Sequence, residues 1–378
     1  MESKSQTGSK GFKMKILLLG DVNSVHIIKW AKSLALNGID IFIFSLNKCV
    51  VDDYNNIKNI EIYALDEVTS YKEASFSKIK YLKSLPKLKE IINNYKPDIL
   101  HAHFVTSYGL LGALSGFHPF VLSVWGVDVF SFPKKSFLHK LILKYNLNKA
   151  DKILSTSHSM AKETKLYTNK DIEVTPFGID MEQFKPMNTK EELFDKDDIA
   201  IGTVKALEET YGIEYLIKAF KIVSDKYKDL PLKLLIVGGG SLENSLKDLV
   251  KKLKIENKTV FVGKVPFGEV PKYHNMLSIS IFPSINESFG VSVIEASACE
   301  KPVVVSNVGG LPEVVENGVS GFVVPPRNPK KIAETIEKLI SDANLRKQIG
   351  ENGRERVKML YNWEDNVRQM IQIYKELC

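Results

Sequence analysis

Two glutamates stand eight positions apart in the stretch Asn286–Glu295, which reads NESFGVSVIE. The short apolar segment Ile279–Phe282 before it predicts a buried strand, and Val291–Cys299 predicts a helix with one apolar face. Gly290 therefore falls at a helix N-terminus, where outward-pointing backbone N–H groups suit a phosphate or another anion. Glu287 falls just beyond the carboxyl end of the predicted strand, where ligands usually bind in an open α/β sheet. The stretch thus predicts a strand, a ligand-binding loop and a helix of a doubly wound domain.

Strand-like and helix-like segments alternate along the whole chain, and the alternation restarts after residue 198. This alternation predicts parallel sheets with right-handed helical crossovers. Because 378 residues exceed what one hydrophobic core usually carries, we expect an α/β chain of two doubly wound domains. The expected strands are residues 15–19, 39–45, 99–101, 120–124 and 152–155 in the first half and 199–203, 232–237, 259–262, 279–282 and 302–306 in the second.

Composition sets the expected domain boundaries. The N-terminus is polar and has no apolar signal region, so we expect a disordered leader or an added extension, with Met14 as the natural start. A polar segment rich in Lys, Glu and Asp predicts a linker between the two halves. The expected parts are the leader 1–13, an N-terminal domain 14–184, the linker 185–198, a C-terminal domain 199–360 and a last helix over 361–378.

Charge and cysteine usage narrow the function classes. A formal charge of +7 is modest for this length, and no nucleic-acid-binding motif accompanies it. The three cysteines have no metal-like spacing, which favours a reducing cytoplasm and gives no support to a structural zinc. The basic and apolar segment 78–89 is either a solvated helix face or a contact with the inner face of an anionic membrane or with a lipid-linked acceptor. No apolar run reaches the roughly 18 residues of a membrane-spanning helix.

The two glutamates match the Glu-x7-Glu motif of retaining nucleotide-sugar glycosyltransferases, and the chain from Met14 onward resembles family 4 of that group. The resemblance implies the GT-B fold, with two Rossmann-like domains facing a central cleft and the C-terminal helix crossing back to the first domain. It also implies that the first domain binds the acceptor and the second the donor. Glu287 would contact hydroxyls of the donor sugar, and Glu295 would hold the ribose. A carboxylate suits this task because it accepts two bonds from neighbouring hydroxyls.

The resemblance implies further donor-binding residues. Gly263 and Lys264 stand where family members bind the base, and Gly20 would let the backbone approach the diphosphate. The start of the predicted helix would stabilise the departing diphosphate through Ser288, Phe289, Gly290 and Val291. A glycine turn at residues 238–240 lacks the dinucleotide spacing, which disfavours an NAD enzyme.

Two departures from the family pattern concern cations and the acid–base position. Lys205 takes the role of the family's arginine, and Thr210 or Tyr211 stands where a lysine is expected. The second cation is therefore missing, unless Lys264 or a residue of the first domain compensates. Trp125 replaces the histidine of the family's His-Gly-x-Asp pattern. Since tryptophan cannot move a proton in this way, we assign no acid or base work to that position.

Acceptor-side candidates lie in the first half. His101 and His103 alternate on a strand and point to one face, and His103, at the strand end, is the better site candidate. Zinc would need further ligands of suitable spacing. Asp128 either orients its loop, contacts an acceptor hydroxyl or caps a turn. Ser24 and His26 open a helix, so Ser24 is either an N-cap or an acceptor contact, and His26 either faces the acceptor or lies on the surface.

We therefore expect a metal-independent, retaining glycosyltransferase without a cofactor. It would move a hexose or N-acetylhexosamine from a UDP- or GDP-sugar to a hydroxyl acceptor in the synthesis of a cell-surface polysaccharide, glycolipid or glycoconjugate. The leaving phosphate would accept the acceptor's proton, and the expected catalytic residues are Glu287, Lys205, His103 and Asp128. One alternative is a non-catalytic nucleotide-sugar-binding subunit of the same fold. Another is a nucleotide-sugar epimerase, which lacks the support of the paired motif.

Overall fold

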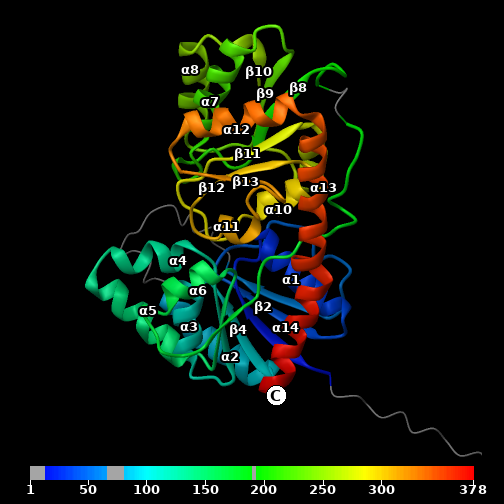
Figure 1. Cartoon of the computed structure of the whole chain (residues 1–378). Coiled ribbons are helices and arrows are strands. Elements are labelled where there is room, and N and C mark those ends of the chain that lie inside the picture. Colours follow the sequence, from blue (N-terminus) through cyan, green and yellow to red (C-terminus); the bar gives the residue numbers. More distant parts are fainter. Residues whose placement is uncertain (1–12, 66–80, 190–192) are drawn as a thin grey trace, which may run out of the picture. The chain divides into compact units, whose positions relative to one another are not determined.

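The computed structural model describes residues 13–65, 81–189 and 193–378 (Figure 1). Most of the expected leader, the first three residues of the basic segment 78–89 and part of the expected linker lie outside the described residues. The chain divides into two compact units. The first unit comprises Met1–Ser155, Glu163–Glu173 and Val367–Cys378, and the second comprises Thr156–Lys162 and Val174–Asn366.

The first unit contains a seven-stranded sheet in the order β3-β2-β1-β4-β5-β6-β7. Every residue of β4 and β5 is buried, as expected for parallel strands that are covered on both faces. The strands are β1 (Lys15–Leu19), β2 (Asp40–Ser45), β3 (Ile60–Ala64), β4 (Ile99–His103), β5 (Phe120–Val124), β6 (Lys152–Ser155) and β7 (Ile172–Val174). The helices along this part of the chain are α1 (Val25–Leu36), α2 (Leu85–Tyr95), α3 (Ser107–Ser115), α4 (Val127–Phe130), α5 (Phe137–Lys149) and α6 (His158–Thr164).

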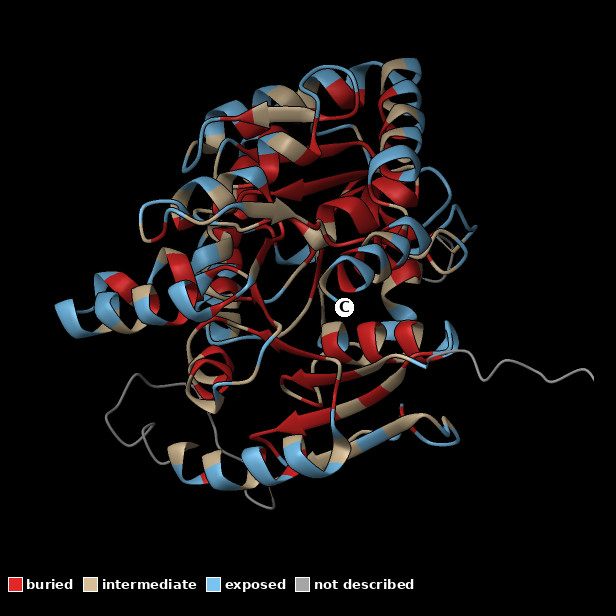
Figure 2. Cartoon of the chain, turned by 90° about the horizontal axis from the view of Figure 1, so that it is seen from below, coloured by how far each residue is buried: buried red, intermediate tan, exposed pale blue. Residues whose placement is uncertain are grey.

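The second unit contains a six-stranded parallel sheet in the order β10-β9-β8-β11-β12-β13. Its strands bury their apolar side chains against helices, and the buried strands appear red in Figure 2. The strands are β8 (Ile199–Val204), β9 (Leu232–Val237), β10 (Thr259–Gly263), β11 (Ile279–Phe282), β12 (Val303–Ser306) and β13 (Phe322–Val324). The helices are α7 (Ile213–Lys226), α8 (Glu243–Lys252), α9 (Val270–Met276), α10 (Val291–Ala298), α11 (Leu311–Val314), α12 (Pro329–Ser341) and α13 (Ala343–Leu360).

Each unit consists of more than one stretch of the chain, because distant segments pair with each other. Residues 174–184, which we placed in the N-terminal domain, group with the second unit. There the N–H of Ile179 donates to the carbonyl of Tyr361 at 2.7 Å. The last helix, α14 (Trp363–Leu377), starts in the second unit, whereas its residues from Val367 onward group with the first. In the part of the chain that the structure describes, no helix is long and apolar enough to cross a bilayer.

Candidate functional site

An ion pair lies at the carboxyl ends of two neighbouring strands of the second unit. Lys205 directly follows β8, and Glu287 lies on the loop between β11 and α10. Because β8 and β11 are adjacent and parallel, their carboxyl ends meet at one edge of the sheet. The Nζ atom of Lys205 lies 2.8 Å from Oε2 of Glu287, and the side chains are 12% and 11% exposed. The structure thus brings together the two residues that the sequence predicts as the centre of the site.

Tyr211 also contacts this lysine. The Nζ atom of Lys205 lies 4.2 Å from the centroid of the Tyr211 ring, which belongs to the 3-10 turn Glu209–Tyr211. Burial would lower the pKa of Lys205, but the charge of Glu287, followed by those of Tyr211 and Glu295, holds it above its ordinary value. Lys205 therefore carries a positive charge in a nearly dry position, and electrostatic interactions are strong there.

Glycines let the surrounding loops approach one another closely. Gly309 has a φ of +52°, and a Cβ atom there would lie 1.7 Å from the carbonyl oxygen of Glu287. The N–H of Gly310 donates to the same oxygen at 3.2 Å. Gly290 caps α10 with a φ of +112°, in the left-handed region. These contacts fix the backbone on both sides of the predicted anion-binding helix start.

Thr210 takes part in this frame through its backbone and its side chain. Its carbonyl accepts from the N–H groups of Ile285 and Asn286 at 2.8 and 3.2 Å. Its hydroxyl donates to the carbonyl of Asn286 at 3.2 Å. Thr210, one of the two residues at the place of the expected lysine, therefore holds the loop that carries Glu287.

Glu295, the second glutamate of the motif, lies on α10 and is only 6% exposed. Its Oε2 atom lies 3.4 Å from Nε2 of His274, a fully buried residue of α9. His274 was not predicted from the sequence, because a single histidine in a short helix has no pattern that separates it from a core residue. The contact between α9 and α10 thus places the imidazole of His274 beside the carboxylate of Glu295.

The remaining predicted donor residues occupy two places. Gly263 ends β10 with a φ of +85°, and Lys264 after it is exposed. The N–H of Gly238 donates to the carbonyl of Gly263 at 2.9 Å, so the β9 and β10 loops are joined. Since β9 alone separates β10 from β8 in the sheet, Lys264 and Lys205 lie on the same edge.

At the helix start, only some groups face outward. Phe289 is buried against Phe177 and Tyr361, with ring centroids 6.0 and 5.3 Å away. The carbonyl of Ser288 accepts from the hydroxyl of Ser157 at 2.7 Å. Val291, the first helical residue, is half-buried. The side chain of Phe289 therefore supports the loop, and its backbone remains the part suited to a ligand.

In the first unit, aromatic rings gather at the ends of β1, β4 and β5, which are neighbours in the sheet. The ring centroid of Trp125 lies 5.5 Å from that of His26 and 4.9 Å from that of His103. Gly20, at the end of β1, is buried, and a Cβ atom there would lie 2.4 Å from Cδ1 of Ile27. Ser24 occupies the N-cap position of α1, but its hydroxyl makes no capping hydrogen bond.

His103 is enclosed in a way that fixes its charge. It is 2% exposed, and neither ring nitrogen has a hydrogen-bond partner among the described residues. Burial, aided by the charge of His26, lowers the pKa of His103 to about 3. Its neighbour His101, by contrast, shares hydrogen bonds with Tyr374 at 2.6 Å and Ser123 at 2.8 Å. His103 is therefore a neutral imidazole at physiological pH.

Asp128 uses both carboxylate oxygens on backbone groups. It accepts from the N–H groups of Gly126 at 2.7 Å, Val105 at 3.0 Å and Trp125 at 3.3 Å. Burial raises its pKa, and the backbone hydrogen bonds oppose that rise. Of the alternatives that the sequence left open, the structure favours the one in which Asp128 orients the loop of Trp125.

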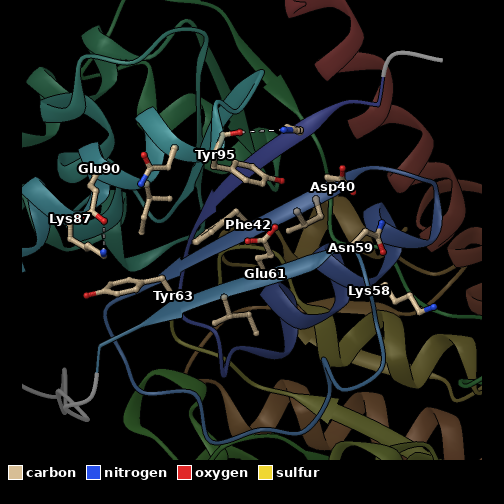
Figure 3. A pocket seen from close by; sticks show the side chains of 14 residues that line it. Asp40, Phe42, Lys58, Asn59, Glu61, Tyr63, Lys87, Glu90 and Tyr95 are labelled. Carbon is tan, nitrogen blue, oxygen red and sulfur yellow. Dashed lines mark hydrogen bonds and ion pairs between the residues drawn. The ribbon is translucent and has the colours of Figure 1, made fainter. Parts of the chain in front are cut away.

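A separate hollow of about 670 Å³ lies in the first unit against β1–β3 and α2 (Figure 3). Two of its lysines have partners within it: Lys87 contacts Glu90 at 2.7 Å, and Lys15 donates to the carbonyl of Tyr95 at 3.4 Å. None of its lining residues is a predicted site residue. Within the described ranges, no three His, Cys, Asp or Glu side chains are placed to hold a metal ion.

The chain is similar to known proteins over most of its length. Residues 184–356 match the family described as glycosyl transferases group 1, and residues 15–157 match the family described as glycosyl transferase 4-like. The capsular polysaccharide biosynthesis glycosyltransferase CapM of Staphylococcus aureus is 34% identical over 304 residues, which cover 75% of this chain and 79% of CapM.

Two solved structures are similar to the chain in fold. Sucrose-phosphate synthase from Thermosynechococcus elongatus has a TM-score of 0.82 at 23% identity, with 97% of this chain and 99% of that one covered. HepE of Anabaena, in complex with UDP and glucose, has a TM-score of 0.80 at 19% identity, with 96% and 100% covered. The likeness shows a GT-B fold, as the sequence predicts.

Proposed function

The chain belongs to the group 1 glycosyltransferases, and from that premise we propose that it transfers a hexose or N-acetylhexosamine from a nucleotide-diphosphate sugar to a hydroxyl acceptor with retention of configuration. The observation that carries the proposal is the nearly dry ion pair between Lys205 and Glu287 beside the start of α10. A bound donor diphosphate would pair with the ammonium group of Lys205 in place of Glu287. Glu287 would then be released to accept hydrogen bonds from the hydroxyls of the donor sugar.

Charge development explains why this arrangement suits transfer. As the bond between sugar and diphosphate breaks, negative charge grows on the leaving group, and a fixed cation stabilises that state. Lys205 and the N–H groups at the start of α10, from Ser288 to Val291, supply this stabilisation without a metal ion. Lys264, on the same edge of the sheet, is our candidate for the missing second cation.

The rest of the donor would be bound by neighbouring loops. Glu295, oriented by His274, would hold the ribose, and the backbone at Gly263 would bind the base. UDP is the first nucleotide to test, since HepE of the same fold was crystallised with UDP and glucose. Gly20 is the candidate of the first unit for a backbone contact with the diphosphate.

The acceptor side is proposed to use the ring cluster of the first unit. Trp125 gives one N–H donor and a stacking face, and His103 is a neutral donor or acceptor. His26 and Ser24 open the neighbouring helix, and Asp128 positions the loop. Because none of these groups is an obvious base, we propose that the leaving phosphate accepts the proton of the acceptor hydroxyl.

The biological acceptor is proposed from the relative CapM, whose name assigns it to capsular polysaccharide biosynthesis. A cell-surface polysaccharide, a glycolipid or a lipid-linked glycan would each offer the required hydroxyl. Such an acceptor would place the protein in the cytoplasm, at the inner face of the membrane. No cofactor besides the donor is needed for this reaction.

A second candidate function is a non-catalytic subunit that binds a nucleotide sugar. It is favoured by two departures: Thr210 or Tyr211 stands where the family has a lysine, and Trp125 stands where it has a histidine. A donor screen separates the two functions: the purified chain is incubated with UDP- and GDP-sugars and candidate acceptors, and nucleotide release and glycoside product are measured. A transferase gives product with at least one donor and acceptor. Donor binding without turnover across the panel would instead establish the binding subunit.

A further inference from the structure

Helix α5 has an apolar face that the core of the first unit does not use. Its buried side chains include Leu143 and Leu147, which are fully buried. Four large apolar or aromatic side chains on the same helix are exposed: Phe137 by 75%, Leu138 by 52%, Leu141 by 45% and Tyr145 by 40%. At 3.6 residues per turn, these four lie within an arc of about 100° on the helix. α5 therefore presents an exposed apolar stripe in addition to its packed one.

The neighbouring helix α4 adds a further exposed apolar side chain. α4 and α5 both pack on the 3-10 turn Phe132–Lys134, and α4 lies next to α5 in Figure 1. Val127, at the first position of α4, is 63% exposed. We call Val127 and the four exposed side chains of α5 the α5 face.

Lysines are frequent along the chain that forms the α5 face, whereas Asp128, the acidic residue next to Val127, is buried. Residues 129–150 contain five lysines and neither Asp nor Glu. Lys134 pairs with Glu163 at 3.2 Å. The other four make no ion pair with any described carboxylate, and they are Lys135, Lys140, Lys144 and Lys149. The α5 face is therefore apolar at its centre and positively charged around it.

We propose that the α5 face docks on an anionic lipid bilayer. A helix with Phe and Leu on one side and lysines beside them lies in the plane of a bilayer, with its apolar side chains among the acyl chains. The lysines would then meet the negative surface of the lipid headgroups. Tyr145 suits the boundary, because its ring is apolar and its hydroxyl can stay in contact with water.

The positive charge of the α5 face favours an anionic bilayer over a second copy of the chain as its partner. Two α5 faces in a symmetric dimer would bring their lysines together, and like charges at an interface oppose association. The face is also a convex helix surface, which a fluid bilayer fits without a shaped groove. An anionic bilayer satisfies both the apolar stripe and the lysines.

The location differs from the membrane contact expected at residues 78–89. In the described part of that segment, 81–89, no large apolar side chain is exposed, and Leu88 is fully buried. The segment also continues into Glu90, which pairs with Lys87. The α5 face is independent of the proposed transfer chemistry, so either can fail without the other.

Vesicle co-sedimentation of the full chain tests the proposal. Vesicles of phosphatidylcholine with phosphatidylglycerol are compared with vesicles of phosphatidylcholine alone. The double variant Phe137→Ser/Leu141→Ser removes two apolar side chains from the face, and Lys140→Gln/Lys144→Gln removes two charges. Leu36→Ser is the matched control, since Leu36 is an 82% exposed leucine at the end of α1.

The wild-type chain should sediment with the anionic vesicles, less so as salt is added. Because each buried apolar side chain contributes strongly to insertion, the Phe137→Ser/Leu141→Ser variant should bind at least about tenfold more weakly. The Leu36→Ser control should bind like the wild type, and all variants should keep the wild-type circular dichroism. The proposal is overturned if the wild-type chain stays in the supernatant, or if the Phe137→Ser/Leu141→Ser and Leu36→Ser variants bind the anionic vesicles equally. It is also overturned if the Phe137→Ser/Leu141→Ser variant loses self-association but still binds these vesicles like the wild type.

Discussion

Among single residues, Lys205 is the one whose surroundings say most about chemistry. A nearly dry ammonium group is costly unless it is paired, and Glu287 pairs with it at 2.8 Å. Tyr211 supports the same group with its ring at 4.2 Å. Both partners leave the charge of Lys205 intact, which is what a departing diphosphate requires. Lys205 is thus held ready for an anion.

Replacing this lysine tests that role. Lys205→Met should lower kcat by about 10² to 10³, because one fixed charge at the leaving group is lost. Lys205→Arg should retain far more activity, since it keeps the cation. Lys218→Met is a suitable control, as Lys218 forms a surface pair with Glu214 on α7. Equal kcat values for the Lys205→Met and Lys218→Met variants would show that the diphosphate binds elsewhere.

Gly309 has a role that any side chain would disturb. A Cβ atom there would collide with the carbonyl of Glu287, and the φ of +52° adds a cost of about 1 to 2 kcal/mol for other residues. Gly309→Ala should therefore lower the free energy of unfolding in urea and weaken donor binding. Gly318→Ala is the control, because Gly318 also has a positive φ but its Cβ would meet nothing within 4 Å. If both variants keep wild-type donor affinity, the Gly309 contact does not shape the site.

His103 should make the stability of the chain depend on pH. Its pKa of about 3 in the folded state lies below its unfolded value of about 6.5. Between these values the unfolded state binds more protons, so this contribution is complete above about pH 6.5 and is lost as pH falls. His103→Gln should reduce the loss of unfolding free energy by about 1 kcal/mol per pH unit between pH 6 and 5. Urea unfolding at several pH values measures this free energy for both chains. If it changed equally with pH in the wild type and in His103→Gln, His103 would not have the lowered pKa.

Among the structural elements, α14 shows how a distant segment completes a unit. Tyr374 of this helix is fully buried and shares a 2.6 Å hydrogen bond with His101 of β4. The last helix was predicted over residues 361–378, but a pattern along the chain does not show which partner a buried hydroxyl finds. The helix and the strand are joined by a polar contact inside an apolar interior.

Tyr374→Phe tests this contact. Removing the hydroxyl leaves a buried ring nitrogen of His101 without its partner, which should cost about 1 to 3 kcal/mol of unfolding free energy. Tyr145→Phe, at an exposed position on α5, should cost far less. Urea unfolding compares the two variants, and a Tyr374→Phe variant as stable as the control would contradict the stabilising role.

The buried central strands were predicted most accurately. Long apolar runs predicted the central strands β1, β2, β8 and β9 nearly to the residue. Three of the four edge strands, β3, β7 and β13, were not predicted, whereas the fourth, β10, was predicted from residues 259–262. The three that were not predicted are short and mostly half-buried, so their apolar pattern is weak.

The same limit applied to the candidate site. Glu287 and Glu295 were predicted from the Glu-x7-Glu motif, and Lys205 from the family resemblance. His274 and Tyr211 were not assigned roles, because a supporting residue is recognised by the atoms that it touches in the fold. Asp128 could be placed in its loop-orienting role only when its backbone partners were known.

In the whole molecule, the two units carry different chemistry. In the second unit, the ammonium group of Lys205, the two carboxylates of the motif and the N-terminus of α10 lie near one edge of the sheet. The first unit joins aromatic rings, among them the neutral imidazole of His103, at the ends of three neighbouring strands. A charged donor and an uncharged hydroxyl acceptor would suit the second and the first unit, respectively.

Glycosyl transfer by the Glu287→Ala variant is the measurement that tests the central claim most directly. The variant should lose transfer by at least about 10²-fold, because the sugar hydroxyls lose their carboxylate. Its circular dichroism and its binding of the nucleoside diphosphate should stay close to wild type, since Lys205 and Glu295 remain. Glu334→Ala, which removes a surface glutamate paired with Lys331, should transfer like the wild type. Transfer by Glu287→Ala at the rate of that control would contradict the assignment of Glu287 to the donor sugar.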